Sequence, residues 1–215
     1  MNPVWPLNAP PLMPDEFGSF GVFRKNNRHT GVDLYCELGT EVVAAVDGIV
    51  RVIEPFTGPS ACSASPWWND TVAILIEDGW RVSVYGEVSR PMVTVGQQVK
   101  RGEVIGVIDR PVLKSNKGRP MVMLHFERMK CWARQTLWWK LGEQQPEALY
   151  DPTDFLLKAA GADVAFFKLS DYDGKRFIDP AAPKKPSPWW GHWGVTGFLV
   201  PHPLNPEDGP AQGSP

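Results

Sequence analysis

Residues 41–53 read EVVAAVDGIVRVI, two runs rich in β-branched residues that are separated by Asp47-Gly48. β-Branched side chains favour strands, and Asp-Gly between two such runs is a strong signal for a β-hairpin. Residues 71–85 repeat the pattern around Asp78-Gly79. The two segments therefore predict antiparallel hairpins and an all-β fold class, with the strands arranged as an antiparallel sheet or sandwich.

More strands are predicted on the C-terminal side of these hairpins. Residues 93–108 form a third β unit punctuated by glycines, and residues 122–127 alternate as a further strand. The segments 54–70 and 110–120 are rich in Pro, Ser, Gly and Lys, so we expect long loops there. Long loops in a compact β domain often carry function.

Composition divides the 215 residues into a domain with an extended arm at each end. Residues 1–17 and 161–215 are rich in proline or tryptophan and lack strand periodicity. Residues 18–160 hold the β pattern and end in a short helix that is predicted to begin near Asp151. We expect both arms to be held by their own domain or by other subunits of a large assembly.

Tryptophan is unusually frequent, with 10 copies, and several are paired. The pairs are Trp67-Trp68, Trp138-Trp139 and Trp189-Trp190. Two interpretations stay open, because a paired Trp suits either one. The side chains are anchors at the edge of a core or interface, or they are platforms for a sugar chain.

The charge balance predicts which partners are absent. A net charge of -2, from 22 basic and 24 acidic residues, predicts no nucleic-acid or membrane surface. No apolar run approaches the roughly 20 residues of a membrane-spanning helix, and the first residues lack the pattern of a secretory signal. Cys36, Cys62 and Cys131 form no even framework, which fits synthesis in a reducing compartment.

A candidate metal site comes from two separate segments. His29 and Asp33 form an H-x-x-x-D motif, and His125 lies on the alternating strand. Two imidazoles and one carboxylate are a common ligand set for a hydrolytic zinc, because three protein ligands leave a fourth position for water. Met123 shares a strand face with His125, so we expect both in one open groove. Glu127 is on that face too, as a partner for the imidazole or as a carboxylate at the rim.

Several motifs, in order, resemble the lysostaphin and LytM type of zinc endopeptidases, which cut peptide cross-links in bacterial cell walls. The matching segments are Gly18-Ser19-Phe20-Gly21 with Arg24, the H-x-x-x-D motif, the glycine-punctuated β units that begin at Gly39 and Gly96, the His125 strand, and Asp151-Pro152-Thr153. The resemblance covers about residues 18–157. It implies a lysostaphin-like fold, Zn²⁺ held by His29, Asp33 and His125, and peptidoglycan as the substrate.

Two positions depart from that family. Glu87 stands where the resemblance implies a catalytic histidine, and Met123 replaces the first histidine of an H-x-H strand. A glutamate can act as a base, whereas methionine offers only a weak acceptor sulfur. We therefore expect a zinc-binding, peptidoglycan-endopeptidase-like protein with weak or lost hydrolysis. The alternatives are an active zinc endopeptidase with Glu87 as general base, a structural zinc with Glu87 as fourth ligand, and a plain surface carboxylate at Glu87.

The resemblance also bears on location and partners. A wall-cutting fold without a secretory signal needs another route to the wall, so by analogy we expect a phage tail-tip or baseplate component. Such a protein is made in the host cytoplasm and binds other tail proteins through its arms. A further alternative is the carrier domain of sugar phosphotransferase systems, which contains a similar His-x-Gly-x-Asp segment. The His-Phe-Glu strand and the Asp-Pro-Thr ending argue against it.

Overall fold

The fold is built mainly of antiparallel sheets, as the sequence predicts. The computed structural model describes residues 2–14, 17–62, 65–115 and 121–167. Its elements are β1 (Leu12–Pro14), β2 (Val32–Tyr35), β3 (Thr40–Val43), β4 (Gly48–Thr57), β5 (Thr71–Glu77), β6 (Arg81–Val88), β7 (Arg90–Pro91), β8 (Gln98–Val99), β9 (Val104–Ile108), β10 (Met123–Lys130), β11 (Leu149–Tyr150), α1 (Thr153–Ala160), a 3₁₀ turn (Gly161–Asp163) and β12 (Ala165–Phe167).

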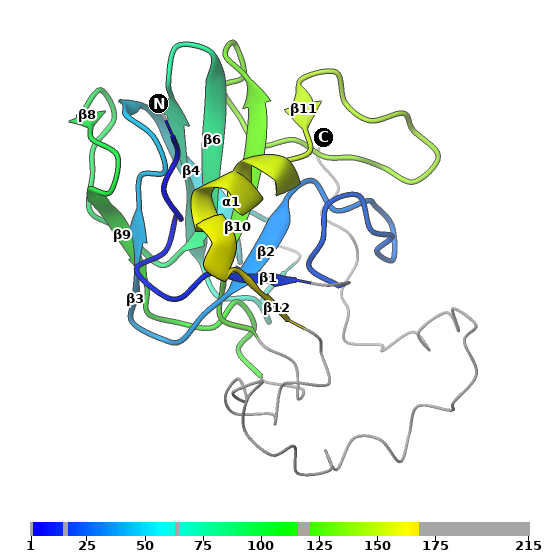
Figure 1. Ribbon diagram of the computed structural model, residues 1–215. Helices are drawn as coiled ribbons and strands as arrows, with labels where there is room; N and C mark the ends of the chain where they lie inside the picture. The colour runs from blue at the N-terminus through cyan, green and yellow to red at the C-terminus, as the bar shows by residue number, and fades with distance from the viewer. Residues whose placement is uncertain (1, 15–16, 63–64, 116–120, 168–215) are drawn as a thin grey trace, which may run out of the picture.

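The described strands form two sheets and one separate pair (Figure 1). The main sheet has seven strands in the order β11-β10-β6-β5-β4-β8, with β2 also paired to β10. A second sheet has the order β3-β9-β7, and β1 pairs with β12 in parallel. Strand β10 thus lies between β6 on one side and β2 with β11 on the other.

Strands β5 and β6 form the hairpin that the sequence predicts at Asp78-Gly79. The Asp78 carboxylate accepts hydrogen bonds from the backbone N–H groups of Trp80 and Arg81. Gly79 has a φ of 88°, a conformation that glycine adopts without steric cost. The turn residues therefore specify this hairpin locally.

The hairpin predicted at Asp47-Gly48 is wrong. Strand β3 pairs with β9, whereas β4 pairs with β5 and β8, so the chain passes from one sheet to the other at this turn. The physical reason is that the turn residues bond to more distant segments. The Asp47 carboxylate accepts the N–H of Arg101, and the N–H of Ala45 donates to the Tyr85 hydroxyl.

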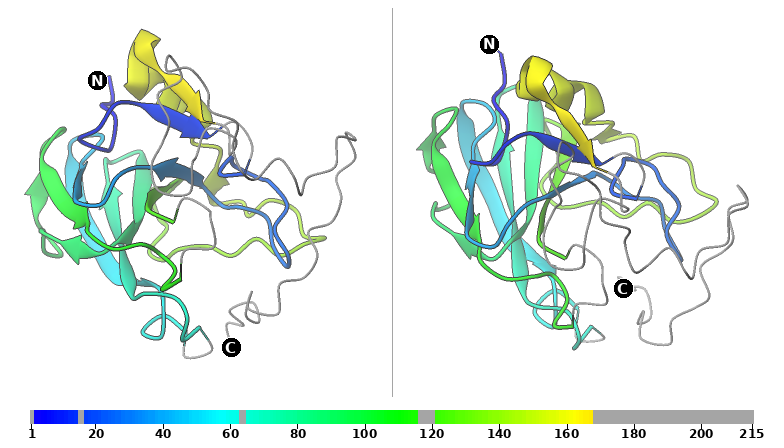
Figure 2. Two further views of the ribbon diagram at one scale, coloured as in Figure 1. Left: turned by 90° about the horizontal axis from the view of Figure 1, so that it is seen from below. Right: turned by 60° about the horizontal axis from the view of Figure 1, so that its bottom comes forward.

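The N-terminal segment packs against the sheets. Trp5, Leu7 and Met13 are buried in the same apolar cluster as Leu156 of α1. Three backbone hydrogen bonds, with N···O distances of 2.9 Å, tie residues 4–8 to β3 and to the residues that follow it. Figure 2 shows this segment and α1 on the same side of the sheets.

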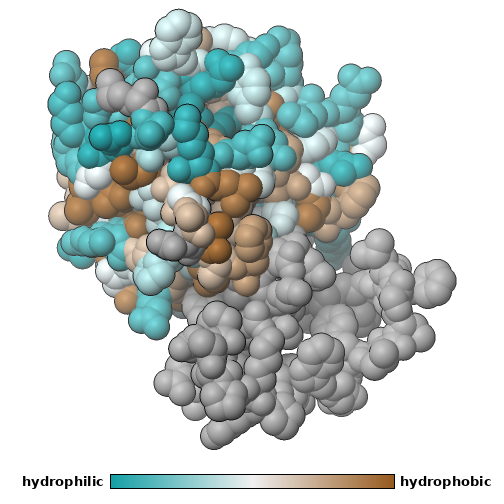
Figure 3. All heavy atoms as spheres, viewed as in Figure 1, coloured by the Kyte–Doolittle hydropathy of each residue, from teal (hydrophilic) through white to brown (hydrophobic). Residues whose placement is uncertain are grey.

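Strand β12 returns the chain after α1 to the N-terminal segment. Leu12 of β1 lies opposite Ala165 of β12, and apolar residues gather near the end of α1 and β1 on the face shown in Figure 3. Phe166 is 55% exposed. Residues 168–215, including Trp189-Trp190, lie outside the described residues, so the predictions made for them stay predictions.

The two segments predicted to be long loops lie side by side. Residues 54–57 belong to β4, so the first loop is shorter than predicted. Its second half pairs with the other loop: the N–H of Asn69 donates to the carbonyl of Val112, and Trp68 forms an isolated bridge with Leu113. The pairing thus brings residues 68–69 beside residues 112–113.

Helix α1 begins near Asp151, as predicted, and the Asp151 carboxylate accepts the N–H of Thr153 at 2.8 Å. Phe155 of this helix stacks on Phe126 of β10, with ring centroids 5.7 Å apart. Within the described ranges, no helix has the length and apolar character needed to cross a membrane.

Trp5→Ala is expected to destabilise the protein by about 3–5 kcal/mol, because removal of a buried aromatic side chain leaves a cavity. Trp80→Ala is the matched control. The Trp80 side chain is 80% exposed, so its loss is expected to cost less than about 0.5 kcal/mol. Equilibrium unfolding in urea measures both. Equal, small losses would show that the N-terminal segment adds nothing to the core.

Candidate functional site

Three side chains singled out from the sequence meet at one point. His29 Nε2 lies 3.1 Å from Asp33 Oδ1, and His125 Nδ1 lies 2.9 Å from the same oxygen. The two nitrogens are 3.0 Å apart. All three residues are buried. The structure thus brings together a donor set that suits a metal ion, while the role of the three as ligands stays a prediction.

Strand pairing places these groups. His125 of β10 lies opposite Asp33 of β2, and His29 precedes β2 in the H-x-x-x-D segment. Gly31 lets this segment approach β10. A Cβ atom at this position would lie 2.4 Å from the carbonyl oxygen of Phe126 and 2.8 Å from His125 Nε2. Such distances are too short for any side chain, so the close approach requires glycine.

In each imidazole, the ring nitrogen that does not contact Asp33 donates a hydrogen bond to another acceptor. His29 Nδ1 donates to the carbonyl oxygen of Ser19 at 2.8 Å, and His125 Nε2 donates to Glu127 Oε1 at 3.0 Å. Each neutral ring therefore turns an unprotonated nitrogen toward the other ring and toward Asp33. Three acceptors that face one another in a buried site are unfavourable unless a proton or a cation lies among them.

The two imidazoles differ in the direction of their pKa shifts. Burial lowers the pKa of His29. Burial alone would also lower the pKa of His125, but hydrogen bonds to Asp33 and Glu127 outweigh it and raise this pKa to about 9. Burial alone would raise the pKa of Asp33, yet the charges of His29 and Arg24 hold it well below its usual range. A proton on His125 therefore satisfies the cluster at neutral pH.

Arg24 orients the carboxylate of Asp33. Its Nη2 donates to Asp33 Oδ2 at 2.6 Å, which leaves Oδ1 to face the two histidines. Sequence reasoning missed this role and the role of the Ser19 carbonyl. Both residues lie in the loop before β2, and no periodic pattern predicts the path of that loop.

Glu87 lies on the other side of β10 from Asp33. Gly86 of β6 pairs with His125, so Glu87 is the residue of β6 that follows the partner of His125. Val72 of β5 pairs with Val88 of β6, and Ile74 pairs with Tyr85. One residue of β5 therefore lies opposite Gly86 and Glu87, which form a β-bulge. Glu87 has a φ of 63°, and no other non-glycine residue in the described part has a positive φ. The bulge interrupts the alternation of the strand and redirects this side chain.

The carboxylate of Glu87 is buried and hydrogen-bonded. The hydroxyl groups of Thr57 and Thr71 donate to its Oε2 at 2.8 Å and 2.9 Å. Burial raises the pKa of Glu87 to about 7, although these two hydrogen bonds oppose the shift. A carboxyl group with a pKa near neutral pH can both take up and release a proton. The role of Glu87 as a base stays a prediction.

Met123 lies in apolar surroundings. It is buried in a cluster with Tyr35 and Val112, and Leu12 and Trp68 pack against this cluster. A thioether cannot donate a hydrogen bond. The position where the resemblance implies a histidine therefore offers no polar donor from its own side chain.

The expected open groove differs from what the structure shows. All five side chains predicted to line it are buried, with exposed fractions of 4–8%: His29, Asp33, Glu87, Met123 and His125. The two paired loops and the N-terminal segment supply the apolar residues around Met123. Strand alternation predicts which face a side chain is on, but it cannot predict which loops cover that face.

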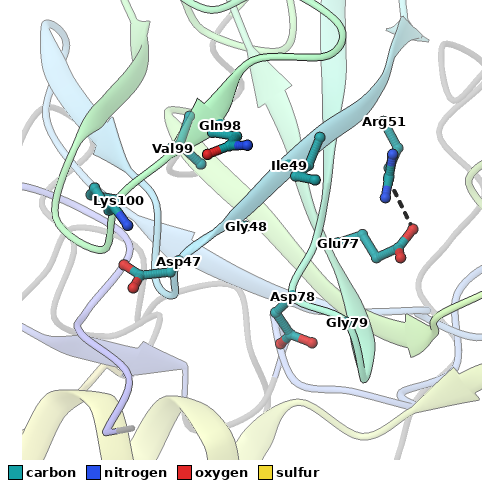
Figure 4. Close-up of a pocket in the computed structure, with 10 residues that line it drawn as sticks. All are labelled: Asp47, Gly48, Ile49, Arg51, Glu77, Asp78, Gly79, Gln98, Val99 and Lys100. Carbon is teal, nitrogen blue, oxygen red and sulfur yellow. Dashed lines mark hydrogen bonds and ion pairs between the residues drawn. The ribbon is translucent and has the colours of Figure 1, made fainter.

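A separate surface hollow lies between the start of β4, the β5–β6 turn and β8 (Figure 4). Its carboxylates already have partners. Glu77 pairs with Arg51 and Arg134, and Asp78 pairs with Arg128. The third carboxylate, Asp47, accepts the backbone N–H of Arg101. The candidate site is therefore the cluster of His29, Asp33 and His125.

Comparison with known proteins identifies the family. The family model described as Peptidase family M23 matches residues 27–136, just over half of the chain. The cell division protein DipM of Caulobacter vibrioides is 31% identical over 124 residues, which cover 58% of this chain and 17% of that protein. The chain thus spans about a sixth of the length of this relative.

Solved structures with a similar arrangement include two peptidases. Lysostaphin from Staphylococcus simulans is 22% identical, with 68% of this chain and 51% of that chain covered and a TM-score of 0.47. A zinc-containing peptidase from Vibrio cholerae is 20% identical, with 76% and 40% covered and a TM-score of 0.41. The matched residues 27–136 contain His29, Asp33, Glu87, Met123 and His125. The chain belongs to peptidase family M23.

Proposed function

We propose that this protein is a zinc-dependent endopeptidase of peptidoglycan that works slowly, with Glu87 as its general base. The observation that carries the proposal is the buried triangle of acceptor atoms from His29, Asp33 and His125. Membership of family M23 and the resemblance to the lysostaphin type support wall peptides as the substrate class.

The donor set fits zinc in type and in spacing. Zinc in proteins binds imidazole nitrogen and carboxylate oxygen at about 2.0–2.2 Å, so two ligands at a tetrahedral angle lie roughly 3.3 Å apart. The three edges of the triangle measure 2.9–3.1 Å. The Ser19 carbonyl accepts a hydrogen bond from His29 Nδ1, and Glu127 accepts one from His125 Nε2. Metal-bound histidines have such acceptors on the nitrogen that does not bind the metal. Only a small outward shift of the side chains would seat the ion.

The chemistry then divides between the ion and the protein. Zinc, when bound, lowers the pKa of a water molecule and polarises the substrate carbonyl. In peptide hydrolysis the water oxygen bonds to the carbonyl carbon, the C–N bond breaks, and a water proton passes to the amine nitrogen. Glu87 lies beside the cluster, and its pKa of about 7 suits a group that takes this proton and then releases it.

The missing element is a donor toward the oxyanion. Met123 occupies the position where the family resemblance implies a histidine, and its neighbours Tyr35 and Val112 form an apolar cluster with it. Loss of one oxyanion donor typically costs about 10²–10³ in rate. The same argument favours weak over lost hydrolysis, since it predicts reduced turnover rather than none.

His125→Ala is expected to abolish stoichiometric zinc binding, because it removes one of the three predicted ligands and one of the hydrogen-bond partners of Asp33. Elemental analysis of the purified protein measures the zinc content. Glu87→Gln is the matched control, since it keeps the shape of the side chain and leaves the triangle intact. Undiminished zinc in His125→Ala refutes the ligand assignment, and loss of zinc in Glu87→Gln makes Glu87 a fourth ligand.

Glu87→Gln is expected to lower the rate of peptidoglycan cleavage about 10²–10⁴-fold, because an amide cannot take up the proton. Met123→His is expected to raise kcat by as much as about 10²–10³-fold, because imidazole can donate to the oxyanion. Release of amino groups from purified peptidoglycan measures both rates. Met123→Leu, which keeps an apolar side chain, is the control and should match wild type. An equal gain in Met123→Leu would show that packing, not a missing donor, limits the rate.

We further propose that the protein is carried in a phage virion, as a tail-tip or baseplate component. Its N-terminal arm, residues 1–17, and C-terminal extension, residues 161–215, would bind other tail proteins. The proposal rests on analogy: a wall-cutting fold that travels in a phage particle needs no export by the host. Mass spectrometry of purified particles of a phage that encodes the chain is expected to detect it at a fixed stoichiometry. Its absence from such particles would refute this location.

A further inference from the structure

Two threonines on neighbouring strands hold the carboxylate of Glu87. Thr57 ends β4 and Thr71 begins β5, and the two lie opposite each other in the ladder. Their hydroxyl oxygens are 2.6 Å apart, and each lies within 2.9 Å of Glu87 Oε2. The exposed fractions are 7% for Thr57, 3% for Thr71 and 6% for Glu87. These contacts therefore form a buried polar cluster, separate from the three candidate metal ligands.

The backbone around this cluster is shaped to form it. Gly58, directly after Thr57, has a φ of 86°, and a Cβ there would lie 2.6 Å from the carbonyl oxygen of Asn69. Residue 58 can lie this close to the backbone of Asn69 only if it is glycine. The bulge at Glu87 then turns the carboxylate toward the two hydroxyl groups. A positive φ in a glutamate is unfavourable, so surrounding contacts must maintain it.

The two hydroxyl groups can serve Glu87 in both of its protonation states. When Glu87 is ionised, both hydroxyl hydrogens can point at Oε2. When Glu87 takes up a proton on Oε1, Oε2 can still accept from Thr71, and Thr57 can turn its hydrogen to the carbonyl oxygen of Asn69 at 3.3 Å. A buried carboxyl group that exchanges a proton needs a partner before and after the transfer, because an unsatisfied one is costly.

We propose that Thr57 and Thr71 are positioning residues that hold Oε2 of Glu87 and leave Oε1 to exchange a proton with the reacting groups. The inference rests on the proposed role of Glu87 as base. Sequence motifs gave no indication of either threonine, since both stand at strand ends next to a loop. The charged groups that act on Glu87 from other strands are His125 on β10 and Asp33 on β2.

The experiment compares variants that remove a hydroxyl group with variants that keep it. Thr57→Val and Thr71→Val preserve the β-branched shape without the hydroxyl, whereas Thr57→Ser and Thr71→Ser retain it. With purified peptidoglycan and zinc-loaded protein, each Val variant is expected to lower kcat about 10–100-fold with KM unchanged, because the base loses its fixed position. The acid limb of the pH–rate profile is expected to move to higher pH, since both hydroxyl groups favour the ionised carboxylate. The Ser variants should behave as wild type.

A second measurement does not need turnover. Burial raises the folded-state pKa of Glu87 from 4.5 to about 7, so between these pH values the folded protein binds more protons than the unfolded chain. Zinc-free wild type should therefore lose stability relative to Glu87→Gln as pH rises through this window. When Thr71 is replaced by valine, this loss of stability should continue to a higher pH, because the pKa of Glu87 rises. When Thr71 is replaced by serine, the loss should occur over the same pH range as in wild type.

The outcomes separate this inference from the proposed function. Full activity in Glu87→Gln overturns the proposed role of Glu87 and, with it, the catalytic part of the inference. Activity lost in Glu87→Gln but kept in both Val variants overturns only the role of the threonines. If the pH range of the stability loss is unchanged in Thr71→Val, the role of the threonines is also overturned. This measurement is possible even if the protein has no turnover. Equal losses in the Val and Ser variants would show that packing, not the hydroxyl groups, is what matters.

Discussion

The pairing of β10 with its two neighbours is the constraint on which the rest of the site depends. It sets His125 opposite Asp33 on one side and opposite Gly86 on the other. A shift of one residue would turn His125 to the other face of the sheet and separate it from both partners. The register itself is supported by the buried apolar residues Leu124 and Phe126, which face the core from the same strand. The apolar core thus determines the position of the polar groups.

Around this strand, buried polar groups satisfy one another in a definite order. The Ser19 carbonyl and Glu127 set the ring tautomers, and Arg24 takes one oxygen of Asp33. Three acceptor atoms, His29 Nε2, His125 Nδ1 and Asp33 Oδ1, then face one another, and a proton or a cation between them stabilises this arrangement. Proton and metal therefore compete for the same place, and His125, with a pKa of about 9, is the group that must release the proton for a metal to bind. The chemistry of the site is linked to pH through this competition.

The two positions where the family resemblance implies histidines, Glu87 and Met123, have different surroundings. Glu87 is placed by a bulge and held by hydroxyl groups, an arrangement with a defined geometry for a carboxylate. Met123, by contrast, has joined an apolar cluster with Tyr35 and Val112 beneath the paired loops. Glu87 has an ionisable group with a pKa of about 7, whereas Met123 offers only an apolar side chain. That difference is why we propose slow rather than absent hydrolysis.

The sequence by itself determined the β class, the Asp78-Gly79 hairpin, the helix after Asp151 and the residues of the candidate metal cluster. These features depend on turn chemistry, alternation and motif spacing, which act over a few residues or match a whole family. The tertiary structure alone decided three others: the crossing between sheets at Asp47-Gly48, the burial of the candidate site residues, and the binding of Glu87 by threonines. Each depends on contacts between segments far apart in the chain, whose hydrogen bonds and packing override the local preferences that a sequence displays.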